Sequence, residues 1–259
     1  MKITVYILFF ISVSTFAQDV LETSFVKKTD LKVDNLIGID NFGTSYSINN
    51  NVFYKTNTTK TITYNNLQLG NINSANAFNP LKINLFYKDF NTVIVLDNRL
   101  AEIHKIDFNT LPIYKNVTHV STGHDNTIWV FNQDLQKLEL FDYKSKTIRA
   151  QTVPVQSAVL DLKSNYNSCW LLTEKYLYMY NYFGSLVKKL KNEGYSSLVE
   201  NNENIILKKN DSLFYLRKKS DKLLPINLPN LLINQFLVTN ETLYIYNNET
   251  LQQFQLKIN

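Results

Sequence analysis

The stretch that decides the fold is Asn126-Thr127-Ile128-Trp129-Val130-Phe131-Asn132 (NTIWVFN). Its side chains alternate with a period of two, as in a β-strand, and the polar residues at its ends predict turns. Five other stretches have the same pattern: Gly43–Asn49 (GTSYSIN), Asn91–Asp97 (NTVIVLD), Asn167–Thr173 (NSCWLLT), Asn204–Asn210 (NIILKKN) and Glu241–Asn247 (ETLYIYN). The sequence therefore contains six copies of one unit.

The spacing of the copies indicates repeated sheets. Their first residues are 48, 35, 41, 37 and 37 residues apart. Such a period is typical of supersecondary units that cannot bury their own faces alone. Each unit has room for four short strands, and both faces of each sheet carry apolar residues, as in the blades of a β-propeller. In the third unit we expect strands at Val117–Ser121, Thr127–Asn132, Lys137–Asp142 and Ile148–Val153.

The two ends of the repeat favour a closed ring. The last unit has strands at Gln235–Thr239, Thr242–Asn247 and Leu251–Lys257 and lacks a fourth, whereas Glu22–Thr29 is an extra strand before the first unit. Pairing this N-terminal strand with the last unit would cover an open edge. We therefore predict an all-β fold, a six-bladed β-propeller of four-stranded blades whose last blade is closed by the N-terminal strand. An open solenoid is the alternative, and it would need caps at both ends.

Residues 1–17 have the pattern of a signal peptide. Lys2 is followed by the apolar run Ile3–Val13 and by a small-residue cleavage site at Thr15–Ala17. The apolar run is too short for a spanning helix, so we expect no membrane span after its removal. Residues 18–259 would then form a single propeller domain that is periplasmic or secreted and peripheral to the outer membrane.

Charge and cysteine content limit the partners. The formal net charge is +5, and part of the surplus is at Lys188, Lys189 and Lys191 on an expected outer strand. We interpret these lysines as a solvated strand edge. The alternatives are an acidic partner, anionic lipid headgroups or nucleic acid, and export makes nucleic acid an unsuitable target. Cys169 is the single cysteine, so no internal disulfide is expected.

The sequence lacks the patterns of a catalytic or metal site. His104, His119 and His124 fall in different elements and belong to no HExxH motif or carboxylate cluster. Nucleophile motifs, calcium loops and glycine-rich phosphate loops are absent from the sequence as well. The inner strands, such as Lys82–Tyr87, are expected to be mainly apolar. We therefore expect no enzyme activity, no cofactor and no metal.

Two features suggest recognition or packing. Tyr176, Tyr178, Tyr180 and Tyr182 alternate along one strand, which favours packing between blades over a sugar platform. The longest insertion, Gly70–Pro80 (GNINSANAFNP), lies between the first and second units. Loops on a rigid scaffold often carry recognition. We expect this insertion to project from the face of the outer-to-inner connections, with Phe78 and Pro80 as contacts for a partner protein.

The units Asp125–Asn132 and Leu36–Lys55 resemble the repeat of secreted β-propellers, in which a turn rich in Gly, Asp and Asn precedes an aromatic strand. WD40 propellers match less well, because Gly123-His124 occurs once and no Trp-Asp pair closes a blade. The quinoprotein dehydrogenase signature is missing.

A short exported propeller rich in Asn, Ile, Lys and Tyr is similar to the periplasmic plug of the type IX secretion translocon. The resemblance implies a non-catalytic protein that binds an outer-membrane barrel complex. A scaffold of an outer-membrane assembly machine and a carbohydrate-active or hydrolytic propeller are the alternatives.

Overall fold

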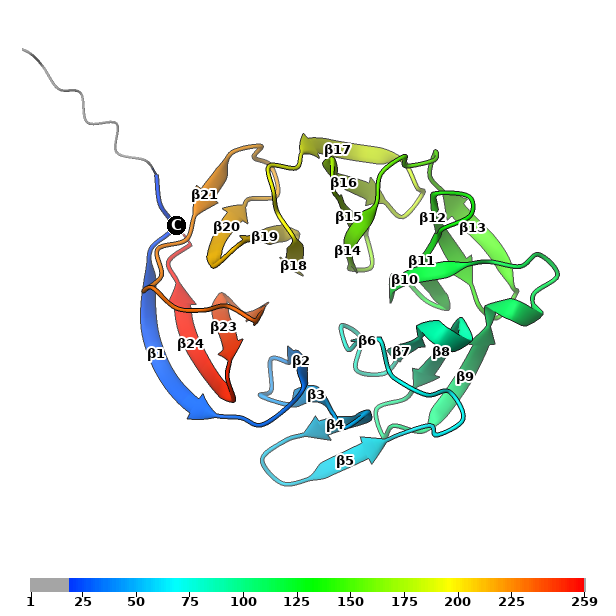
Figure 1. Ribbon diagram of the computed structural model, residues 1–259, viewed down its shortest axis with the longest axis horizontal. Coiled ribbons are helices and arrows are strands. Elements are labelled where there is room, and N and C mark those ends of the chain that lie inside the picture. The colour runs from blue at the N-terminus through cyan, green and yellow to red at the C-terminus, as the bar shows by residue number, and fades with distance from the viewer. Residues whose placement is uncertain (1–18, 259) are drawn as a thin grey trace, which may run out of the picture.

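The computed structural model describes residues 19–258, and it shows six four-stranded antiparallel sheets arranged as a ring (Figure 1). The predicted all-β, six-bladed propeller is thereby confirmed. The predicted signal peptide, residues 1–17, lies outside the described residues and stays a prediction. Among residues 19–258, no helix is long and apolar enough to cross a membrane.

The strands follow one another around the ring, each blade running from its innermost to its outermost strand. Blade 1 contains β2 (Asn35–Ile39), β3 (Ser45–Asn49), β4 (Val52–Thr56) and β5 (Thr61–Tyr64). Blade 2 contains β6 (Ser74–Asn76), β7 (Ile83–Tyr87), β8 (Thr92–Leu96) and β9 (Glu102–Asp107), with short 3-10 turns η1 (Lys88–Phe90) and η2 (Phe108–Thr110). Blade 3 contains β10 (Val117–Thr122), β11 (Thr127–Asn132), β12 (Lys137–Asp142) and β13 (Thr147–Gln151).

The remaining blades continue in the same order. Blade 4 contains β14 (Val159–Ser164), β15 (Ser168–Thr173), β16 (Tyr176–Asn181) and β17 (Leu186–Lys191). Blade 5 contains β18 (Ser197–Asn201), β19 (Asn204–Lys209), β20 (Ser212–Leu216) and β21 (Leu223–Pro225). Blade 6 contains β22 (Gln235–Thr239), β23 (Thr242–Asn247), β24 (Thr250–Leu256) and, as its outer strand, β1 (Thr23–Asp30).

Blade 6 closes the ring as predicted. β1 pairs antiparallel with β24, from Thr23 opposite Leu256 to Asp30 opposite Thr250. Just before β1, the buried Leu21 exchanges backbone hydrogen bonds of 2.9 Å with Pro225 and Asn227 beside the outer strand of blade 5. The N-terminal segment therefore covers the edge of blade 6 and also joins it to blade 5.

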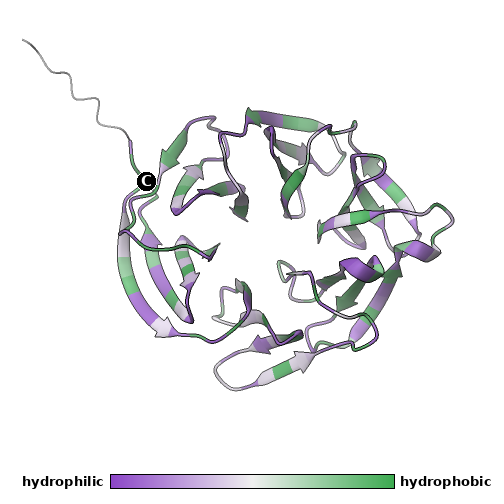
Figure 2. Ribbon diagram, viewed as in Figure 1, coloured by the Kyte–Doolittle hydropathy of each residue, from purple (hydrophilic) through white to green (hydrophobic). Residues whose placement is uncertain are grey.

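The core consists of apolar layers between neighbouring blades. Trp129 packs between blades 3 and 4 and Trp170 between blades 4 and 5, with 1% and 2% of their surfaces exposed. The rings of Tyr178 and Tyr180 stack 5.9 Å apart in the layer against blade 3, so the tyrosine strand packs between blades. Figure 2 shows apolar and polar bands along the outer strand β1, whereas β7, β8, β11 and β15 are buried at every residue.

The predicted alignment of the second unit is wrong. Asn91–Asp97 was matched to the second strand of a blade, but it contains β8, the third strand. β7 and β8 are both fully buried, so both have the apolar pattern, whereas β6 is a three-residue polar strand inside the predicted insertion. Lys82–Tyr87 is consequently not an inner strand. The inner strands also carry polar contacts, since Ser121 lies 3.2 Å from Asn76 Nδ2 and 2.7 Å from the Ser164 hydroxyl.

The turns fall on two faces of the ring because the strands alternate in direction. The turns that join first to second strands, and third to fourth strands, lie on one face, which we call the turn face. The second-to-third turns and the connections between blades lie on the opposite crossover face. In blade 6, β24 ends and β1 begins at the turn face.

Candidate protein-interaction surface

The structure places the predicted contact residues on the turn face. Phe78 and Pro80 belong to the turn between β6 and β7, and only residues 70–73 of the insertion belong to the crossover connection. The prediction that both side chains project from the connection face is therefore wrong, because the unrecognised strand β6 carries the chain across to the other face. Phe78 is 44% exposed and Pro80 is half-buried.

Phe78 is part of a group of exposed rings that come from three blades. Its ring lies 5.0 Å from that of Tyr166, edge to face. The His124 and Tyr182 rings are 6.0 Å apart, and Tyr182 packs on Phe183 at 4.0 Å. The Tyr182 N–H donates to the Asn167 carbonyl at 3.1 Å, which joins the two ring pairs. We call these residues the aromatic patch: Phe78, His124, Tyr166, Tyr182 and Phe183.

Asparagine side chains fix the turns that carry the patch. Asn76 Oδ1 accepts a hydrogen bond from the Phe78 N–H at 3.0 Å. Asn181 Oδ1 accepts from the Phe183 N–H at 3.0 Å and also from Ser185. Such Asx turns rigidify the backbone. The rings are therefore presented in set positions, and Phe183 is 66% exposed.

The turn after Asn181 also needs its glycine. Gly184 has a φ of 77°, and a Cβ there would lie 2.8 Å from the Gln151 carbonyl oxygen of blade 3. Only glycine adopts this backbone without strain and leaves this space. The blade 4 turn that carries Tyr182 and Phe183 is thus seated against blade 3.

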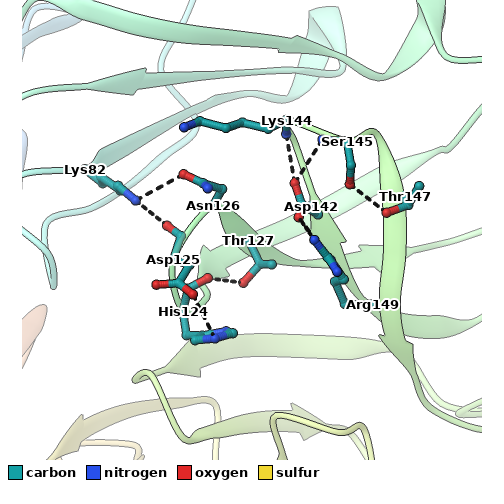
Figure 3. Close-up of polar contacts among 10 residues, drawn as sticks. All are labelled: Lys82, His124, Asp125, Asn126, Thr127, Asp142, Lys144, Ser145, Thr147 and Arg149. Carbon is teal, nitrogen blue, oxygen red and sulfur yellow. Dashed lines mark hydrogen bonds and ion pairs between the residues drawn. The ribbon is translucent and has the colours of Figure 1, made fainter.

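The turn between β10 and β11 carries His124 of the patch (Figure 3). The Lys82 ammonium reaches from blade 2 and donates to the Asp125 carbonyl at 2.5 Å and to Asn126 Oδ1 at 3.3 Å. His124 Nε2 lies 3.2 Å from Asp125 Oδ2, and the Thr127 hydroxyl donates to the His124 carbonyl at 2.5 Å. These contacts bind blade 2 to blade 3 and hold His124 beside Tyr182.

Asp142 organises the basic turn between β12 and β13 (Figure 3). Asp142 accepts hydrogen bonds from the Lys144 and Ser145 N–H groups at 3.0 Å and from Arg149 at 2.6 Å. Burial alone would raise the pKa of Asp142, but these hydrogen bonds and the Arg149 charge outweigh it and lower the pKa. Lys144 and Lys146 are exposed beside this carboxylate.

The histidines show no metal-binding arrangement. His104 lies on β9, His119 on β10 and His124 in the turn that follows. Burial lowers the pKa of His119, although the Asp161 carboxylate opposes the shift. Within residues 19–258, no three His, Cys, Asp or Glu side chains are grouped so that they could hold a metal ion. The expectations of no cofactor, no metal and no enzyme activity stay predictions.

Sequence reasoning identified Phe78 but missed most of the patch. Tyr166 was not singled out, and Tyr182, with Phe183 beyond it, was assigned to the tyrosine strand, which ends at Asn181. One signal was available. An Asn or Asp stands two residues before an exposed aromatic residue in three turns, namely Asn76–Phe78, Asn181–Phe183 and Asp40–Phe42.

Neither protein-family models nor curated protein sequences match the chain. Solved structures of several kinds share the fold. Virginiamycin B lyase from Staphylococcus aureus aligns with 90% of this chain and 99% of its own, with a TM-score of 0.60 and 10% identity. The Pan2 WD40 domain from Neurospora crassa aligns with 88% of this chain and 76% of its own, with a TM-score of 0.59 and 8% identity.

A third similar structure is PorZ from Porphyromonas gingivalis, described as a bacterial surface component of the type-IX secretion system. It aligns with 84% of this chain and 31% of its own, with a TM-score of 0.54 and 15% identity. The three proteins differ in function and are all distant in sequence. Together they show that the chain has the β-propeller fold.

Proposed function

We propose that the protein is a non-catalytic propeller of the cell envelope that binds an outer-membrane protein complex through the aromatic patch. The observation that carries the proposal is the patch itself, five rings from blades 2, 3 and 4 that are exposed on hydrogen-bonded turns. Exposed apolar groups of this kind mark interaction sites in monomeric proteins. Aromatic anchors on rigid loops also lose little entropy on binding and dominate interface energies.

The finer form of the proposal names the complex. The protein would plug the periplasmic side of the type IX secretion translocon. Its support is the compositional resemblance to that plug and the similarity of fold to part of PorZ, a component of the same system. The signal-peptide pattern of residues 1–17 supports the periplasmic location that this role requires.

The test is capture of partners from detergent-solubilised envelopes with tagged protein. We expect wild type to recover an outer-membrane barrel complex. The double variant Phe78→Ala/Phe183→Ala should recover at least about tenfold less, because each anchor is expected to contribute at least about 1 kcal/mol of binding energy. Both positions are exposed, so the melting temperature should stay unchanged.

Phe42→Ala is the matched control. Phe42 is also an exposed aromatic residue two positions after an Asx acceptor, Asp40, but it lies in blade 1 and has no ring contact with the patch. The Phe42→Ala variant should recover the complex in the same amount as wild type. Equal recovery by the double variant would exclude the patch as the docking surface. Recovery of a different outer-membrane complex would exclude the type IX translocon but keep the broader proposal.

A further inference from the structure

Two outer strands carry the same four-residue pattern. β1 contains Phe25-Val26-Lys27-Lys28, and β17 contains Leu186-Val187-Lys188-Lys189. Each is a large apolar residue, a valine and two lysines. We call these two segments the apolar–lysine motifs. The aromatic patch does not include them.

A β-bulge displays the apolar pair in both motifs. The pairing of β1 with β24 skips Val26, between Phe25 opposite Phe254 and Lys27 opposite Gln253. The pairing of β17 with β16 skips Val187 in the same way. A bulge leaves an extra residue unpaired in the ladder and redirects its side chain. The four apolar side chains, Phe25, Val26, Leu186 and Val187, are 52–59% exposed on these outer strands.

The bulge alone does not account for the pattern. The outer strands of blades 2 and 3 have bulges at the equivalent place, where the skipped residues are Ile103 and Arg149. Ile103 stands between Glu102 and His104, and Arg149 is paired with Asp142. Neither strand combines two exposed apolar residues with a lysine pair. The motifs are therefore a property of blades 4 and 6 within the described chain.

The motifs also carry free positive charge. Lys188 is paired with Asp221 at 2.8 Å. Lys27, Lys28 and Lys189 form no ion pair with any of residues 19–258. The Lys189 ammonium lies 4.0 Å from the centre of the Tyr176 ring, which holds it at the surface. Each motif thus sets exposed apolar side chains beside unneutralised cations.

Both motifs lie near the turn-face end of the rim. β1 and β17 begin at the turn face, and the apolar pair of each motif lies in the first half of its strand. Figure 1 shows the two strands on the outside of the ring with blade 5 between them. One flat surface that approaches the turn face can therefore meet both motifs together.

We propose that the two motifs bind a lipid bilayer surface that carries anionic headgroups. Apolar side chains enter the boundary between headgroups and acyl chains, while adjacent lysines stay at the level of the phosphates. A bilayer offers this combined chemistry at any lateral spacing, which suits two equal motifs separated by one blade. A protein partner would need two equal acidic and apolar sites at that spacing. Two weak anchors together also bind far better than one.

The experiment is sedimentation of the purified protein with defined vesicles. We expect binding to vesicles of equal parts phosphatidylcholine and phosphatidylglycerol, and none to phosphatidylcholine alone. The variant Lys27→Gln/Lys189→Gln should bind about 25-fold more weakly, since each lysine near an anionic surface contributes about fivefold. Added salt should weaken wild-type binding.

The contribution of the apolar side chains to vesicle binding is tested separately. Val26→Ser/Val187→Ser should weaken vesicle binding, while Ile103→Ser, the equivalent bulge residue of blade 2, should leave it unchanged. Failure of wild type to bind anionic vesicles at low salt would overturn the proposal, as would equal binding to neutral vesicles or equal losses in the motif and Ile103 variants. All these positions are exposed, and a shared melting temperature shows that the variants are folded. Phe78→Ala should keep vesicle binding, because Phe78 lies in blade 2 and neither motif does, so this result is independent of partner capture.

Discussion

Trp129 and Trp170 show how one residue position recurs in neighbouring blades. Both are the fourth residue of their repeat and fill the layer toward the next blade. Period-two alternation was sufficient to predict this burial. In a propeller both faces of a strand are covered by neighbouring blades, so these large rings are buried in the packed layers between blades.

Replacing Trp129 by Ala should lower the free energy of unfolding by about 3–5 kcal/mol, because it removes a fully buried ring and leaves a cavity. Urea unfolding followed by circular dichroism measures the loss. Trp170→Ala should cause a loss of similar size in the free energy of unfolding. A loss below about 1 kcal/mol, or full quenching of both tryptophans by iodide in the native state, would contradict the packing.

Asp142 leads to a pH prediction. Its lowered pKa means that the folded state favours the charged form. The stabilisation is therefore present above the unfolded pKa of about 4 and is lost as pH falls through the folded value. Asp142→Asn should cost about 1–3 kcal/mol at neutral pH, and the difference from wild type should shrink below about pH 4.

The measurement is a series of urea titrations between neutral and acid pH. Asp125→Asn is the control, since that side chain is 79% exposed on the same face and should change stability by less than about 0.5 kcal/mol. A cost for Asp142→Asn that is the same at every pH would show that charge is not the cause.

At the scale of elements, β1 is the outer strand of the last blade, although it comes from the N-terminal part of the chain. Deleting residues 18–30 should expose the edge of β24 and the ring of Phe254, which packs against Phe25 at 5.6 Å. An open edge promotes association with other chains. We expect a sharply lower melting temperature together with oligomers in size-exclusion chromatography. A truncated protein that stays monomeric and melts with wild type would show that β1 is dispensable.

The sequence predicted strands where apolar alternation marks them and failed where it does not. β11 and β23 were placed with their observed bounds. β6 was missed because Ser74–Asn76 is short and polar, and its pairing with β7 is decided by the neighbouring blade rather than by its own side chains. The same error put Phe78 on the wrong face. The aromatic patch was mostly missed, because rings in separate turns come together only through the curvature of the ring.

At the scale of the whole molecule, the layers between blades are unequal. The layer between blades 6 and 1 has three buried apolar residues at its centre, Leu36, Tyr246 and Leu251, whereas nine fill the layer between blades 3 and 4. The blade 6 to blade 1 layer is supplemented by polar contacts, such as the Tyr246 hydroxyl donating to the Val33 carbonyl at 2.7 Å. The stability of this interface therefore depends most on the covalent connection between blades 6 and 1.

Circular permutants test this difference. With residues 258 and 19 joined by the same short linker, a chain opened after Lys32 loses the covalent link across the small layer. A chain opened after Gln156 loses the link across the large one. We expect the first permutant to be less stable by at least about 1 kcal/mol, which corresponds to a melting temperature about 2–4 °C lower. Equal melting temperatures would show that the covalent link and not the packing decides stability.

The pairing of β1 with β24 has a mechanical consequence. Because the strands are antiparallel, Thr23 and Leu256 lie opposite each other, and the two ends of the described chain lie at the same corner of the ring. A force that pulls the ends apart would load the hydrogen bonds between these strands one after another, as in opening a zipper, instead of shearing them all together. The ring would yield first at this seam and at low force. A tether attached at either end would thus hold the molecule by its mechanically weakest point.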